Sequence, residues 1–125
     1  MSNILHAANV GIFLLCVVGA ALHHNRRLHV RLMLLAFVLD IGLLLAVELT
    51  DSAVGQAMQG MSDGAPMIMW IHIAFALGGL IMWGVQIWNG RKVLKGDYSV
   101  LKRHALGAKI FMVMRLGNVI TAFMV

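Results

Sequence analysis

Four apolar segments, each about twenty residues long, dominate this chain of 125 residues. They are 4–22, 30–49, 67–88 and 105–125. A helix of about 20 residues spans the roughly 30 Å hydrocarbon layer of a bilayer, and it satisfies its own backbone hydrogen bonds there. The segments are too long and too uniformly apolar to be strands of a membrane barrel. The sequence therefore predicts an all-α membrane protein in which four transmembrane helices form one bundle and one domain.

The composition excludes a soluble domain. Hydrophobic residues make up 61% of the chain and charged residues only 12%, whereas a soluble domain carries about 25% charged residues. The net charge of +5 does not indicate nucleic-acid binding, because eight of the ten basic residues gather in two short polar connections. They are Arg26, Arg27, Arg31, Arg91, Lys92, Lys95, Lys102 and Arg103. Such clusters indicate membrane topology, and we expect the lipid bilayer as the main partner.

The basic residues also predict the orientation of the chain. The connection 50–66 contains Asp51 and Asp63 but no Lys or Arg. By the positive-inside rule, we expect this connection and both termini on the periplasmic or exterior side of a bacterial inner membrane. Trp83 and Trp88 would then lie in the inner aromatic belt. Segment 4–22 resembles a cleaved signal peptide in length, but no Lys or Arg precedes it, which favours a retained helix.

Two opposite charges lie deep inside the predicted membrane helices, Asp40 in 30–49 and Arg115 in 105–125. At a rise of about 1.5 Å per residue, Asp40 lies about 15 Å and Arg115 about 16 Å from the cytoplasmic ends of their segments. An ionisable group at mid-bilayer costs about 2.5 to 3.5 kcal/mol on insertion scales. We therefore expect the two side chains to form a buried ion pair that fixes the register of their helices.

The histidines form two layers near opposite membrane faces. The outer layer comprises His6, Glu48, Asp51 and His72, and the inner layer comprises His23, His24, His29, Gln86, Asn89 and His104. Imidazole coordinates copper, zinc or haem iron, and a carboxylate can complete a metal site or orient the ring. We therefore predict a metal or haem site at His72 with His6 and Glu48 or Asp51, and a second candidate at His29 and His104. No His-x-x-x-His or Cys-x-x-Cys spacing occurs, so either site must form between helices.

Interpretations of these residues without a metal or haem also stay open. His72 can be a core histidine with satisfied hydrogen bonds, and His23, His24 and His29 can bind headgroup phosphate beside the arginines. Met58, Met61, Met67 and Met69 crowd the outer connection and the start of 67–88. Thioether sulfur suits Cu(I), so these methionines are either a copper acceptor or apolar filler of a membrane protein.

Three histidines and their neighbours resemble a known family. The residues that carry the resemblance are His29, Met33, Ala36-Phe37, His72-Ile73 and His104. The family consists of small four-helix bacterial membrane proteins of largely unknown function and includes a maturation factor of the aa3-type haem-copper oxidase. The resemblance covers about residues 9–124, and Glu48 or Asp51 stands where the family has a further histidine. It implies His29, His72 and His104 as functional positions and metal or haem handling during oxidase assembly as the role.

Several functions remain open from the sequence. The first is a non-enzymatic assembly factor that holds copper, another transition metal or haem, with a terminal oxidase subunit as partner. The second is a b-type cytochrome with one haem between His6 and His72 and another between His104 and His24 or His29. The third is a cofactor-free accessory subunit, with homo-oligomers allowed in each case. A metalloenzyme is a fourth, although no nucleophile–base pair or HExxH motif argues for one.

Overall fold

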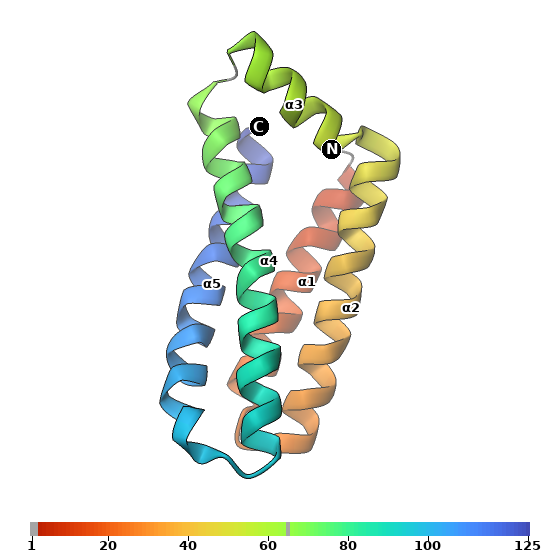
Figure 1. Ribbon diagram of the computed structural model, residues 1–125. Helices are drawn as coiled ribbons and strands as arrows, with labels where there is room; N and C mark the ends of the chain where they lie inside the picture. Colours follow the sequence, from red (N-terminus) through yellow and green to blue (C-terminus); the bar gives the residue numbers. More distant parts are fainter. Residues whose placement is uncertain (1–2, 65) are drawn as a thin grey trace.

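The computed structural model describes residues 3–64 and 66–125, apart from the side chain of Asp51. Its elements are α1 (Asn3–Ala21), α2 (Arg26–Asp51), α3 (Ala53–Asp63), α4 (Met67–Leu94), η1 (Tyr98–Val100) and α5 (Leu101–Met124) (Figure 1). Four helices, α1, α2, α4 and α5, are long and apolar enough to cross a membrane. The described residues contain no strand, so the predicted all-α membrane fold is confirmed.

The helices extend beyond the apolar segments that predicted them. α2 begins at Arg26 and α4 continues to Leu94, because the polar residues that flank each span keep the helical conformation outside the hydrocarbon. Asn25 caps the start of α2, where its side-chain oxygen accepts a hydrogen bond of 3.3 Å from the N–H of Leu28.

A short helix, α3, occupies the connection that the sequence left irregular. Ser52 separates α2 from α3 in a left-handed conformation with φ 49°, and its N–H donates to the Glu48 carbonyl at 3.1 Å. The Glu48 carboxylate then accepts a hydrogen bond of 2.9 Å from the N–H of Val54, which is otherwise an unsatisfied donor in the first turn of α3. Gly64 ends α3 with φ 71°.

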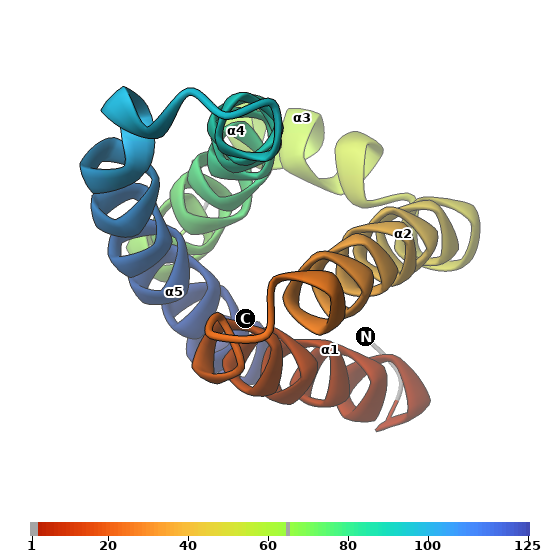
Figure 2. The same ribbon diagram turned by 90° about the horizontal axis from the view of Figure 1, so that it is seen from below.

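The four long helices run antiparallel to their neighbours along the chain. Figure 1 shows both termini and α3 at one end of the bundle, while the connections 22–25 and 95–100 lie at the other. The eight clustered basic residues flank those two connections. The view along the bundle in Figure 2 shows α5, α4, α2 and α1 arranged around a common axis. The most extensive packing joins α4 with α5 and α1 with α2, and α1 also packs against α5.

Small residues allow the closest helix contacts. A Cβ at Gly117 of α5 would lie only 2.6 Å from the Phe75 ring of α4. A Cβ at Gly19 of α1 would lie 2.7 Å from the Met33 sulfur of α2. Helices in lipid associate through such close van der Waals contact, because lipid supplies no hydrophobic force between them.

The contact at Gly117 predicts a stability difference between two glycine variants. Gly117→Ala should lower the stability of the bundle by about 1–3 kcal/mol, because the Phe75 ring that packs against Gly117 must move. Gly42→Ala is the matched control, since a Cβ there meets nothing within 4 Å. Thermal unfolding of the detergent-purified variants measures both, and equal losses would contradict the close contact.

The basic end of the bundle predicts which residues face the cytoplasm. A cysteine at Ser62 in α3 should react with a membrane-impermeant thiol reagent in intact spheroplasts, and a cysteine at Lys95 should react only after permeabilisation. The native Cys16 is 0% exposed and contributes little background. Labelling of Lys95→Cys but not Ser62→Cys in intact spheroplasts would reverse the orientation.

Candidate functional site

A buried polar network lies at the centre of the bundle. Arg115 of α5 is 4% exposed, and its Nη2 donates to Asp40 Oδ1 of α2 at 3.1 Å. The predicted ion pair between Asp40 and Arg115 is therefore confirmed as a direct contact. Arg115 Nη1 also donates to Asn9 Oδ1 of α1 at 2.5 Å and to Asn118 Oδ1 at 3.2 Å.

Trp83 of α4 completes this network. Its indole Nε1 donates to the second Asp40 oxygen at 2.7 Å, so every long helix contributes at least one member. Trp83 is 3% exposed and packs between Phe37 and Phe111. The expectation of an aromatic-belt residue was therefore wrong for Trp83, because its ring turns toward the carboxylate that needs a donor.

Sequence reasoning also missed Asn9, which is 3% exposed. A lone amide inside an apolar run is the signal that could have found it, since an unpaired amide in lipid is costly. Its Nδ2 donates to Asn118 Oδ1 at 3.4 Å. Asn9 thereby links α1 to α5, and its backbone carbonyl accepts a hydrogen bond of 3.5 Å from Arg115 Nη2, the nitrogen that also binds Asp40.

The outer residues predicted as a metal site have separate partners. The His72 ring Nδ1 lies 2.8 Å from Thr121 Oγ1, and that hydroxyl donates to the Gly117 carbonyl at 2.7 Å. The His6 ring stacks on Phe123 with ring centres 4.4 Å apart. Glu48 caps α3 as described above.

These outer side chains do not assemble into a ligand cluster. Within residues 3–64 and 66–125, no group of three or more His, Cys, Asp or Glu side chains is arranged to hold a metal ion. The side chain of Asp51 lies outside the described part of the chain. The structure therefore does not bring His72, His6 and Glu48 together as one ligand group, and metal binding in the outer layer stays a prediction. His72 and Glu48 have hydrogen-bond partners, whereas the stacked His6 ring has a buried Nδ1 without one.

The inner layer, by contrast, brings two predicted histidines together. The rings of His29 of α2 and His104 of α5 lie with their centres 6.5 Å apart and their planes at 86°. His29 Nδ1 lies 2.7 Å from the Gly19 carbonyl of α1. A carbonyl can only accept, so Nδ1 carries the proton and Nε2 of a neutral His29 carries a lone pair. His23 and His24 instead pack against each other in the exposed connection, with their ring planes tilted by 38°.

Two buried polar atoms beside this pair have no hydrogen-bond partner among the described residues. They are His104 Nδ1 and Gln86 Oε1. Gln86 of α4 donates its Nε2 to the His104 carbonyl at 3.1 Å. The His104 ring also packs on Gly90, where a Cβ would lie 3.3 Å from Cε1. Both atoms therefore sit at one contact between α4 and α5, and each carries unused capacity for a donor or a cation.

Comparisons with protein-family models, curated proteins and solved structures found no match to this chain. The candidate functional site therefore rests on the residues themselves. It is the pair His29 and His104 with Gln86, which we call the inner histidine site.

The central network predicts strong coupling between Asp40 and Arg115. Asp40→Asn should destabilise the bundle more than the double variant with Arg115→Gln, because the single change leaves a buried guanidinium without a counter-charge. We expect about 3–5 kcal/mol for the single change. Thermal unfolding in detergent measures the cycle, with Lys109→Gln on the exposed face of α5 as control. Strictly additive losses would contradict the coupling.

Proposed function

We propose that this protein binds a transition metal, with copper favoured, at the inner histidine site. The supporting observation is that His29, with its proton held on Nδ1 by the Gly19 carbonyl, lies beside His104, whose Nδ1 is buried without a partner. Metal-binding histidines in proteins are oriented in this way, since the second ring nitrogen donates to a carbonyl or carboxylate.

The spacing of the two rings suits one shared ion. An imidazole ring radius of about 1.2 Å and a metal–nitrogen bond of about 2.0 Å place the centres of two ligating rings about 6.4 Å apart when they face each other. The observed separation is 6.5 Å. Gln86 Oε1, also buried without a partner, is a further oxygen donor at the same layer.

Copper is favoured over other metals on chemical grounds. Among divalent first-row metals, copper binds nitrogen sites most tightly, and imidazole suits both copper and zinc. Met58, Met61 and Met67 are 63%, 67% and 74% exposed at the opposite end of the bundle. They are available as soft Cu(I) acceptors on the other side of the membrane, separate from the inner histidine site.

The biological role follows from the resemblance to the oxidase maturation family. We place the protein among non-enzymatic factors that hold a metal during assembly of a haem-copper oxidase, with a subunit of that oxidase as partner. The bacterial inner membrane is the proposed location. The resemblance implies His29 and His104 as functional positions from the sequence alone. The 6.5 Å distance between their rings is a separate observation that supports the same pair.

Haem is the second candidate ligand for the same pair. Two histidines that ligate one haem iron from opposite faces have nearly the same ring separation, so the 6.5 Å spacing is equally suited to iron. This form of the proposal uses one haem at His29 and His104. An outer haem between His6 and His72 has less support, because those rings are engaged with Phe123 and Thr121.

Removal of either inner histidine should abolish cofactor binding. His29→Gln and His104→Gln should each lower the affinity of the detergent-purified protein for Cu(I), or for haem, by more than about ten-fold, because a first ligand matters at least as much as its orienting partner. His72→Gln and His24→Gln are matched controls that should retain the cofactor. Metal analysis and the absorption spectrum distinguish copper from haem.

The outcome of this experiment decides the proposal. A Soret band that disappears in His29→Gln selects haem, and copper without a Soret band selects the metal-binding factor. Retained cofactor in both inner variants would overturn the inner histidine site and move the cofactor elsewhere in the bundle. No binding above background by the folded wild type would leave the cofactor-free accessory subunit.

A further inference from the structure

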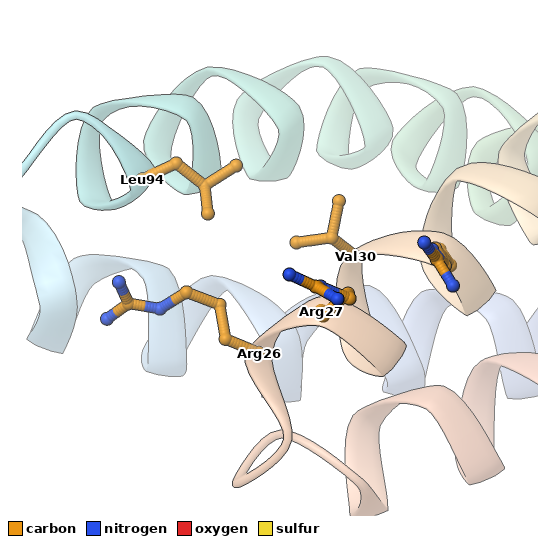
Figure 3. A pocket seen from close by; sticks show the side chains of 5 residues that line it. Arg26, Arg27, Val30 and Leu94 are labelled. Atoms are coloured by element: carbon orange, nitrogen blue, oxygen red, sulfur yellow. The ribbon is translucent and has the colours of Figure 1, made fainter.

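An open cleft lies at the basic end of the bundle. It has a volume of about 410 Å³ and is lined by Arg26, Arg27, Val30 and Arg31 of α2 and by Leu94 of α4. Figure 3 shows Val30 and Leu94 extending toward each other from the two helices, with Arg26 and Arg27 beside them. The surface of the cleft is therefore mostly apolar, and three of the five residues that line it end in guanidinium groups.

The cleft exists because α2 and α4 do not close against each other. α2 packs on α1 and α4 packs on α5, whereas α2 and α4 do not pack extensively along the described residues. Leu94 is 50% exposed as a result. The cleft lies in the seam between these two helices, at the basic end of the bundle.

The three arginines have no carboxylate partner among the described residues. The guanidinium of Arg26 lies over the Tyr98 ring, 5.6 Å from the ring centre. The ion pair found among the described residues joins Arg115 with Asp40 at the centre of the bundle. Asp97 is the acidic residue nearest this end in the sequence, and its carboxylate accepts hydrogen bonds from the Ser99 hydroxyl at 2.5 Å and the Ser99 N–H at 3.2 Å.

These hydrogen bonds from Ser99, the side-chain bond first, lower the pKa of Asp97 below its ordinary value, with a smaller contribution from nearby Lys92 and Arg103. Asp97 is therefore charged but engaged in its own turn. The cleft thus keeps an uncompensated positive charge.

We propose that this cleft binds an anionic phospholipid. Arg26, Arg27 and Arg31 bind the phosphate, and the acyl chain lies against Val30 and Leu94 in the seam between α2 and α4. Guanidinium groups pair with phosphate oxygens in bidentate fashion and stay charged at every physiological pH.

An amphiphile fits this cleft better than a free anion does. A free phosphate would use the arginines but leave the exposed Leu94 and the half-buried Val30 uncovered. The cleft also lies at the end that the basic residues assign to the cytoplasmic leaflet, where anionic lipids attract arginines. This inference does not depend on a metal or haem at the inner histidine site.

Native mass spectrometry of the detergent-purified chain tests the proposal. Dioleoyl phosphatidylglycerol and dioleoyl phosphatidylcholine are titrated into the wild type, into Arg26→Gln/Arg27→Gln/Arg31→Gln, and into a control with Lys95→Gln/Lys102→Gln/Arg103→Gln. The control removes the same charge at the same end of the bundle. Thermal unfolding verifies that each variant is folded.

The wild type should prefer phosphatidylglycerol over phosphatidylcholine by about ten-fold or more, because each basic residue near an anionic lipid contributes to binding. The arginine variant should lose this preference, while the lysine and arginine control should keep most of it. Equal loss in both variants would overturn the proposal, since it would show unspecific attraction to a basic surface.

Two further arms separate the lipid from other anions. Inorganic phosphate and glycerol 3-phosphate should displace dioleoyl phosphatidylglycerol poorly at concentrations where dihexanoyl phosphatidylglycerol displaces it well. Leu94→Ser should lower the affinity for the lipid without raising the affinity for the free anions. Competition by inorganic phosphate as effective as that by the short-chain lipid would overturn the lipid proposal in favour of a free-anion site.

Discussion

A guanidinium buried in a bilayer must be paired, and this requirement organises the whole bundle. Arg115 finds a carboxylate on α2 and amide oxygens on α1 and on its own helix, while Trp83 of α4 satisfies the remaining oxygen of Asp40. The contacts of Arg115 fix the rotation and depth of α1 and α2 relative to α5, and the contact of Trp83 with Asp40 fixes α4 relative to α2. Apolar helices can slide past one another in lipid at little cost, so these few hydrogen bonds specify a register that apolar packing alone leaves loose.

The sequence predicts those features that one physical constraint determines. Hydrocarbon thickness sets the length of the four spans, and matching depth identifies Asp40 and Arg115 as partners. The direction of a side chain around its helix is set by many neighbours at once, so depth alone could not show that Trp83 faces the core. The same reason explains the outer layer, where His6, His72 and Glu48 lie at similar depths but point to different partners. The partners are Phe123 for His6, Thr121 for His72 and the Val54 N–H for Glu48. α3 escaped notice because its pattern is short and rich in small residues.

His72 and His104 differ in how their ring nitrogens are used. Thr121 gives its only proton to the Gly117 carbonyl, so its oxygen accepts from His72 and the contact ties α4 to α5. Gly19 orients His29 through a backbone carbonyl from a third helix, but His104 beside it keeps a buried nitrogen unused. An unpaired buried polar atom lowers stability unless a ligand satisfies it, and among the described residues His6 Nδ1 and Arg115 Nε are unpaired in the same way. This asymmetry separates a histidine that joins helices from one that is free to coordinate.

The division of the bundle into two antiparallel pairs has a consequence for biogenesis. The pair α1 and α2 is synthesised and inserted before α4 and α5. Until the second pair arrives, Asp40 and Asn9 face lipid or the insertion machinery without the guanidinium and indole that satisfy them. An incomplete chain thus exposes polar groups at mid-membrane that the finished bundle buries. The five side chains that hold the bundle together are thus divided between the two pairs, and they meet only when the whole chain is in the membrane.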